Sequence, residues 1–178
     1  MIVAALQMNS RDNKEENLLA AEKLIEAAAA RGARLVVLPE MFNFLGPGER
    51  RPLEAEEIPG PTIQRMCQKA VHHNIYIIAG SILEKSHVPG KVYNTSVFIN
   101  PEGRIVACYR KIHLFDVVVE GQTPYQESAT ILPGDQVVTG SIEGTTVGLT
   151  VCYDLRFPEL YRALVSKGAG IISIPSAL

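Results

Sequence analysis

Short apolar runs alternate with segments of helical periodicity through the first part of the chain, and this alternation restricts the possible folds more than any other feature. The run Ile2 to Met8 precedes a helical segment that ends at Gly32, a usual C-terminal stop. The apolar positions of that segment recur at three and four residues: Leu18, Ala21, Ile25 and Ala28. Leu35 to Leu38 is continuously apolar, as in strands buried on both faces. This pattern predicts an α/β fold.

A loop, a second helix and a third strand are predicted next. Gly46 to Gly60 is rich in Pro and Gly and predicts an irregular loop. Pro61 is suited to the first turn of a helix, whose apolar positions are Ile63, Met66, Ala70 and Val71. Ile75 to Leu83 then predicts a strand.

Period-two alternation across a Pro-Gly turn predicts one antiparallel hairpin, and the two-residue connection Glu143-Gly144 predicts a second. The first consists of Tyr93 to Asn100 and Arg104 to Arg110, and the second of Val137 to Ile142 and Thr145 to Val151. A last helix is predicted from Pro158, and a last strand over Ile171 to Ile174. The apolar face of that helix is formed by Leu160, Ala163, Leu164 and Val165.

The composition predicts one compact domain over residues 1–178. Seventeen basic and nineteen acidic residues are interspersed and give a formal charge of −2, which argues against nucleic acid as a partner. No apolar run reaches the roughly 18 residues that would suggest a membrane span, so we expect no membrane partner. Ile2 to Leu6 lacks a preceding basic region and is not expected to be a signal peptide.

The cysteines Cys67, Cys108 and Cys152 are odd in number, and their spacing fits neither a disulfide framework nor a CxxC metal site. We therefore expect a reducing cytoplasm and no metal. Cys67 and Cys108 are interpreted as buried packing residues. The pair His72-His73 near a helix end is explained by interaction with the helix dipole and not by metal binding.

Reactive side chains follow three of the predicted strands. LVVLPE ends at Glu40, VACYRK ends at Lys111, and GLTVCYD contains Cys152. In open α/β sheets the carboxyl ends of the strands form the edge at which ligands bind. We therefore expect a carboxylate, an ammonium and a thiol to converge in one pocket.

These three groups suit acyl transfer from an amide. Cys152 is the candidate nucleophile, and it needs activation because a free thiol with a pKa of about 8.5 is mostly protonated at neutral pH. Glu40 is the candidate base, and it can return the proton to the leaving amine. Lys111 and the backbone N–H of Tyr153 are the candidates to stabilise the oxyanion. Each residue alone has an ordinary structural explanation, and only the combination points to catalysis.

The chain resembles the nitrilase superfamily of carbon-nitrogen hydrolases along essentially its whole length. The motifs that carry the resemblance are LPEMF at 38–42, YRKIHLFD at 109–116 and VCYDLRFPEL at 151–160, in the family's order. The resemblance implies a triad of Glu40, Lys111 and Cys152, with an additional active-site glutamate at Glu127. It also implies a four-layer α-β-β-α sandwich.

The resemblance is strongest to the branch that contains omega-amidase and deaminated-glutathione amidase. It implies hydrolysis of a primary amide on a small 2-oxo acid or a peptide-like relative, with release of ammonia and with no metal or organic cofactor. It also implies a homodimer or larger homo-oligomer. Family members continue beyond the position of Leu178, so the resemblance implies a chain truncated at its C-terminus. Substrate contacts are expected from Gly46 to Gly60 and from Ile112 to Pro124.

Two other functions stay open. The first is a truncated, non-catalytic relative that acts as an interaction module, because the missing C-terminal part would leave sheet surface exposed. The second is a redox-responsive thiol protein built around Cys152. Outside the catalytic set, His113 is expected to order its loop. Asp154 and Arg156 are expected to hold the turn at the cysteine by hydrogen bonds or an ion pair.

Overall fold

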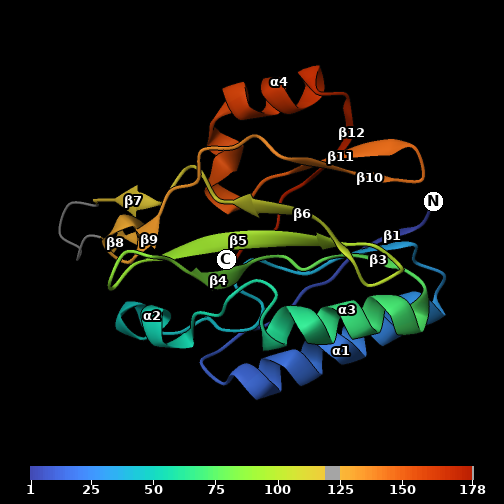
Figure 1. Cartoon of the computed structure of the whole chain (residues 1–178), viewed down its shortest axis with the longest axis horizontal. Helices are drawn as coiled ribbons and strands as arrows, with labels where there is room; N and C mark the ends of the chain where they lie inside the picture. The colour runs from blue at the N-terminus through green and yellow to red at the C-terminus, as the bar shows by residue number, and fades with distance from the viewer. Residues whose placement is uncertain (119–124, 178) are drawn as a thin grey trace.

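The computed structural model describes residues 1–118 and 125–177 of the chain (Figure 1). A larger mixed sheet has the strand order β1-β2-β3-β5-β4, and β6 and β9 also pair with β5. β1, β2 and β3 are parallel to one another, whereas β3, β4 and β6 are antiparallel to β5. The strands are β1 Val3–Ala5, β2 Leu35–Val37, β3 Tyr76–Ile78, β4 Ile82–Lys85, β5 Val92–Ile99, β6 Ile105–Arg110 and β9 Ile131–Leu132.

A smaller sheet packs against the larger one. Its order is β10-β11-β12, with β10 antiparallel and β12 parallel to β11. A separate ribbon of β7 and β8 lies at one end of the molecule (Figure 1). The strands are β10 Thr139–Ile142, β11 Thr145–Leu149, β12 Ala169–Ser173, β7 Asp116–Val117 and β8 Tyr125–Gln126.

Helices cover the outer faces of both sheets (Figure 1). α1 Lys14–Ala30 and α3 Pro61–His73 lie side by side on the larger sheet, and α4 Pro158–Ser166 lies on the smaller one. The remaining helices are α2 Arg51–Glu54 and the 3-10 helices Gly48–Arg50, Glu127–Ala129 and Cys152–Arg156. In the described part of the chain the layers are therefore α, β, β and α, and the predicted sandwich is confirmed.

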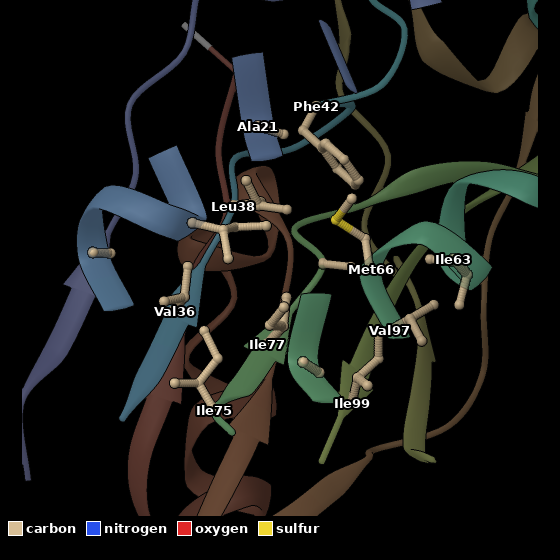
Figure 2. Packing of buried hydrophobic residues seen from close by; sticks show 14 of the residues in the cluster. Ala21, Val36, Leu38, Phe42, Ile63, Met66, Ile75, Ile77, Val97 and Ile99 are labelled. Carbon is tan, nitrogen blue, oxygen red and sulfur yellow. The ribbon is translucent and has the colours of Figure 1, made fainter. Parts of the chain in front are cut away.

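The larger sheet separates two hydrophobic cores because its strands are apolar on both faces. Successive side chains in a strand point to opposite faces. Val36 and Ile77 therefore pack under α1 and α3 together with Met66, as Figure 2 shows. Leu35 and Ile78 point the other way and pack against the smaller sheet. Each such buried side chain contributes roughly 1.5–3 kcal/mol.

Glycines allow close contact between the layers around the smaller sheet. A Cβ added at Gly140 in β10 would lie 2.4 Å from the ring of Phe98 in β5. A Cβ added at Gly148 in β11 would lie 3.0 Å from Leu164 in α4. The smaller sheet is therefore in direct contact with a layer on each side.

Two predicted segments differ from the structure. The predicted loop Gly46 to Gly60 contains a 3-10 helix and α2. The predicted strand Ile75 to Leu83 is divided into β3 and β4, and their pairing with β5 shifts by one residue between Ile78 and Ile82. Gly80, with a φ of +31°, lies in this break.

The predicted helices are confirmed, but their apolar faces are narrower than expected. Val71 in α3 and Val165 in α4 are exposed, although both were assigned to apolar faces. In α1 the four predicted apolar positions are all buried. Asn13 caps the N-terminus of α1, because its side chain accepts a hydrogen bond from the N–H of Glu16 at 3.3 Å. Of the described helices, none is long and apolar enough to cross a membrane.

We predict that Gly80→Ala destabilises the fold much more than Gly90→Ala. A Cβ at Gly80 would lie 1.8 Å from the backbone oxygen of Pro39, so the segment leading from β2 to Glu40 would have to move. Gly90 also has a positive φ, of +72°, but nothing lies within 4 Å of its added Cβ. Gly90→Ala should cost about 1–2 kcal/mol for the left-handed backbone. Gly80→Ala should add an overpacking cost of about 1–3 kcal/mol or more.

Urea unfolding of the two variants measures this difference. Equal losses in the free energy of unfolding would show that contact with Pro39 does not limit the residue at position 80.

Candidate active site

Four of the predicted site residues lie where strands end, and together they are called the site cluster: Glu40, Lys111, Glu127 and Cys152. Glu40 lies in the turn after β2, and Lys111 directly follows β6. Glu127 and Cys152 each begin a 3-10 helix, the first after β8 and the second after β11. β2 and β6 belong to the larger sheet and β11 to the smaller one, so the cluster forms between the two sheets.

The ammonium of Lys111 contacts two carboxylates. Its Nζ lies 3.0 Å from Oε1 of Glu40, and 3.1 and 2.9 Å from Oε1 and Oε2 of Glu127. Lys111 is 2% exposed, so these contacts are shielded from water. Burial lowers the pKa of Lys111, but the two carboxylates outweigh burial and raise the pKa above its usual value. Lys111 is therefore a fixed cation at neutral pH.

Backbone hydrogen bonds hold Lys111 on both sides. Its N–H donates to the carbonyl of Asn94 at 2.8 Å, and its carbonyl accepts from the N–H of Gly134 at 2.8 Å. A Cβ added at Gly134 would lie 2.3 Å from the carbonyl oxygen of Arg110. The absence of a side chain at Gly134 therefore allows the second of these hydrogen bonds.

The two oxygens of Glu40 have different partners. Oε1 accepts from Nζ of Lys111 and from Nδ2 of Asn94, the latter at 2.9 Å. Oε2 accepts from the backbone N–H of Ala177 at 3.0 Å. Cys152 lies close to this pair, because Glu40 raises and the Ala177 N–H lowers the pKa of its thiol. Oε1 of Glu40 is therefore occupied by Lys111 and Asn94, whereas Oε2 is held by the N–H of Ala177.

The thiol of Cys152 is kept protonated by its surroundings. Burial raises its pKa above the ordinary value of 9.0, and the carboxylate of Glu40 raises it further. Lys111 and the Ala177 N–H lower the pKa by less. The raised pKa keeps Cys152 a thiol at neutral pH, so the nucleophile needs a general base to take its proton.

The backbone at Cys152 is strained. Its φ is +48°, in the left-handed region that residues other than glycine rarely occupy. Its N–H donates to the carbonyl of Pro175 at 2.8 Å, just beyond β12. Met41, next to Glu40, also has a positive φ, of +50°, and its N–H donates to Oγ of Ser81 at 3.0 Å. Strained residues of this kind are common at active sites, where surrounding contacts hold them in place.

Asp154 joins the turn at the cysteine to the end of β6. Its buried carboxylate accepts from the hydroxyl of Tyr109 at 2.7 Å and from the N–H of Val151 at 2.9 Å. It also accepts from the N–H of His113 at 3.0 Å and lies 2.7 Å from Nδ1 of that residue. Tyr109 and His113 flank Lys111 in the sequence, so one carboxylate fixes the nucleophile segment relative to the cation segment.

Of the three residues expected to hold this turn or its loop, Asp154 and His113 make the expected contacts and Arg156 does not. Asp154 makes the expected hydrogen bonds. His113 orders its loop through Asp154 and by stacking on Phe157, with ring centroids 3.7 Å apart. Arg156 is exposed and makes no hydrogen bond or ion pair with another described residue, so the expected contact of Arg156 is not found.

Aromatic side chains lie beside the site cluster. The ring of Tyr153 contacts that of Phe115 at a centroid distance of 4.9 Å, and Phe115 is 5.8 Å from Tyr125. The N–H of Phe115 donates to Oε2 of Glu127 at 2.7 Å. Of the segment Ile112 to Pro124 that was expected to contact substrate, residues 119–124 lie outside the described residues. The other segment expected to contact substrate is Gly46 to Gly60. From this segment, the guanidinium of Arg51 donates to the hydroxyl of Tyr125 at 2.9 Å.

Asn94 belongs to this site, and the sequence analysis missed it. It is fully buried in β5, and its Nδ2 lies 2.9 Å from Oε1 of Glu40 and 3.5 Å from Oε1 of Glu127. Asn is depleted in strand interiors. An Asn within the strand Val92–Ile99 was therefore the signal that could have identified it.

The two remaining cysteines differ in burial. Cys67 is half-buried and packs against the core under α3, which agrees with the packing role expected for it. Cys108 is exposed, so its predicted burial is wrong. The reason is that Cys108 lies on the exposed face of β6, which it shares with the exposed residues Val106 and Arg110. Surface hollows of about 490 and 260 Å³ lie beside Cys67 and Cys108 respectively, and neither is lined by a member of the site cluster.

Comparison with known proteins gives consistent matches. The family model described as carbon-nitrogen hydrolase matches residues 2–177. The chain is 40% identical over 175 residues to the omega-amidase NIT2 of Homo sapiens, covering 98% of this chain and 63% of that protein. It is 42% identical over 179 residues to a deaminated glutathione amidase of Synechocystis, covering 99% of this chain and 66% of that protein.

A solved structure matches as well. The crystal structure of Saccharomyces cerevisiae Nit3, a member of branch 10 of the nitrilase superfamily, superposes with a TM-score of 0.86 at 33% identity, covering 99% of this chain and 64% of that one. The chain therefore spans 63% to 66% of the length of these relatives.

We predict that Tyr109→Phe destabilises the fold by about 1–3 kcal/mol, the cost of leaving a buried charged group short of a hydrogen bond. The change removes the hydroxyl that donates to Asp154 and accepts from the N–H of Ile112, while the ring remains. Tyr161→Phe is the matched control, because its hydroxyl lies 3.3 Å from Oγ of Thr150 in a partly exposed position. Chemical unfolding should show a smaller loss for the control, and equal losses would contradict the role given to Asp154.

We also predict that the alkylation rate of Cys152 continues to rise above pH 9, because its thiol pKa lies above the ordinary value of 9.0. Iodoacetamide labelling followed by mass spectrometry of the Cys152 peptide measures this rate. The same peptide in denaturant serves as the control, and its rate should level off at lower pH. A plateau below pH 8 in the folded protein would indicate a thiolate paired with a cation, contrary to the geometry.

Proposed function

The chain belongs to the carbon-nitrogen hydrolase family, and from that membership we propose that it is an amidase with Cys152 as nucleophile and Glu40 as general base. It hydrolyses the C–N bond of a small primary amide to a carboxylate and ammonia through a cysteine thioester. The observation that carries the proposal is that Glu40, which raises the pKa of the Cys152 thiol, also contacts the buried ammonium of Lys111. A nucleophile, a base and a fixed cation are the groups that acyl transfer needs.

The first half of the reaction forms the thioester. Oε2 of Glu40 takes the thiol proton as Sγ of Cys152 attacks the carbonyl carbon. Negative charge develops on the carbonyl oxygen, where it is stabilised by Lys111 and by the backbone N–H of Tyr153. Glu40 then gives the proton to the leaving nitrogen, the C–N bond breaks, and ammonia departs.

The second half consumes water. Glu40 takes a proton from a water molecule as the water oxygen attacks the thioester carbon, and the same donors stabilise the new oxyanion. The C–S bond then breaks. The departing sulfur of Cys152 recovers the proton from Glu40, and the acid product ionises to the carboxylate. The enzyme returns to its starting protonation state.

The hydrogen bonds of Lys111 support its role. An ammonium has three N–H donors. Nζ makes one contact with Glu40 and two with the oxygens of Glu127, so we propose that the oxyanion takes over one of the two donors that point to Glu127. Glu127 has contacts with Lys111 and with the N–H of Phe115, and we assign it to hold the cation in place. Tyr153 lies in the first turn of a 3-10 helix, where backbone N–H groups lack a partner within the helix.

The named relatives suggest the substrate class. Because they are an omega-amidase and a deaminated glutathione amidase, we propose a substrate of the same kind, an amide of a small 2-oxo acid or a peptide-like relative. We propose that neither a metal nor an organic cofactor takes part. We further propose that residues 1–178 form a single domain that works in the cytoplasm as a homodimer or larger homo-oligomer, with neither nucleic acid nor a membrane as partner.

Ammonia release from a panel of primary amides tests the proposal, with 2-oxoglutaramate and deaminated glutathione in the panel. We expect release by the wild-type protein and none by Cys152→Ala with an unchanged far-UV circular dichroism spectrum. Lys111→Met should lower kcat by about 10²–10³-fold because it removes an oxyanion donor. Glu40→Gln should also lower kcat by orders of magnitude, since the amide cannot accept the thiol proton.

The outcomes separate the candidate functions. Activity retained in Cys152→Ala would remove the nucleophile assignment. A change in KM alone in Lys111→Met or Glu40→Gln would contradict the roles given to these residues. If the folded wild-type chain releases no ammonia from any amide, the result favours the non-catalytic interaction module.

A further inference from the structure

Asn94 contacts every charged member of the site cluster. Its Nδ2 lies 2.9 Å from Oε1 of Glu40 and 3.5 Å from Oε1 of Glu127. Its backbone carbonyl accepts from the N–H of Lys111 at 2.8 Å. Nζ of Lys111 binds the same two Oε1 atoms. The two carboxylates are therefore bridged twice, once by an ammonium and once by a neutral amide.

The neighbours of Asn94 determine which end of its amide faces them. Ionised carboxylates can only accept hydrogen bonds, so the amide nitrogen must point toward Glu40 and Glu127. The other end, Oδ1, is buried and has no hydrogen-bond partner among the described residues. An unpartnered buried oxygen and an Asn within a strand both cost stability. Leu at this position would avoid both costs, so the benefit of Asn94 lies in its N–H donors.

A neutral donor suits this position for an electrostatic reason. Two carboxylates share one ammonium, and all three groups are buried, so the cluster carries an excess of negative charge. A second cation would compete with Lys111 for the developing oxyanion. The amide of Asn94 adds donors to both carboxylates without adding charge, and β5 holds it in place.

The contacts of Glu40 show what this donor does. Asn94 and Lys111 both bind Oε1, whereas the N–H of Ala177 binds Oε2. A carboxylate held at Oε1 by two donors cannot rotate freely about its terminal bond. Loss of one of these donors would allow Oε2 to leave the N–H of Ala177.

We propose that Asn94 is a positioning residue, which fixes the carboxylate of Glu40 with Oε1 on Lys111 and Oε2 on the N–H of Ala177, so that Oε2 is the oxygen that takes the proton of Cys152. The kinetic part of this inference rests on the proposed function. The structural part, which is the orientation of the Glu40 carboxylate, can be observed without turnover.

Two variants of Asn94 and one control separate positioning from space filling. Asn94→Leu keeps the approximate size of the side chain and removes its donors. Asn94→Asp keeps the shape and replaces the amide nitrogen with an oxygen that repels the two carboxylates. Ser96→Ala is the matched control, because Ser96 is also buried and lies two residues along on the same face of β5. Its Oγ has no hydrogen-bond partner in the part of the chain that the structure describes.

For the kinetic test, ammonia release is measured after circular dichroism and thermal melting have verified folding. In Asn94→Leu we expect kcat to fall about 10- to 100-fold, as for one hydrogen bond to a charged group, with KM changed by less than about threefold. Asn94→Asp should lose more. Ser96→Ala should stay within about twofold of the wild type. If Asn94 only fills space, the Leu and Asp variants should both retain kcat, and the inference is wrong.

Crystal structures of the wild type and of Asn94→Leu provide the second test. We expect the carboxylate of Glu40 in the variant to lose its contact with the N–H of Ala177. A variant in which Glu40 keeps that contact overturns the inference. If the wild type releases no ammonia from any amide, the proposed function fails, and the orientation of Glu40 in the variant decides the inference alone. If Asn94→Leu does not fold, Asn94→Asp is judged by the same two measurements.

Discussion

The buried ammonium of Lys111 is the constraint on which the rest of the site depends. Taking a charge out of water costs several kcal/mol, which only a closely placed opposite charge can offset. The carboxylates that offset it come from two other segments, with Glu40 after β2 at 71 residues from Lys111 and Glu127 after β8 at 16 residues. The cation can therefore be buried only when these segments are in contact with it. The ion pairs that suit the chemistry thus also hold separate parts of the fold together.

The hydrophobic pattern explains why these segments meet. The strands of the larger sheet are apolar on both faces, so the sheet is covered by helices on one side and by the smaller sheet on the other. This arrangement places the ends of β2 and β6 opposite the end of β11. Asp154 then fixes the two sides to each other through neutral donors and His113. The apolar layers bring the segments together, and the polar contacts set their final positions.

Much of this organisation could be predicted from periodicity and motifs, and the exceptions share a physical cause. Helices and hairpins follow local patterns, which the sequence displays directly. The break at Gly80 depends on how closely Pro39 approaches, and the exposure of Cys108 depends on which face of β6 the neighbouring layers cover. The members of the site cluster were indicated by their motifs, but the contacts of Asn94 were not, because hydrogen bonds between distant segments leave no local pattern.

The backbone after β12 has a further consequence for how this protein is handled. The carbonyl of Pro175 accepts from the N–H of Cys152, and the N–H of Ala177 donates to Glu40. Residues 175–177 thus act as a tether between the nucleophile and the base. A purification tag or fusion that displaces these residues would therefore change the spacing between sulfur and carboxylate, where small displacements have the largest effect on rate.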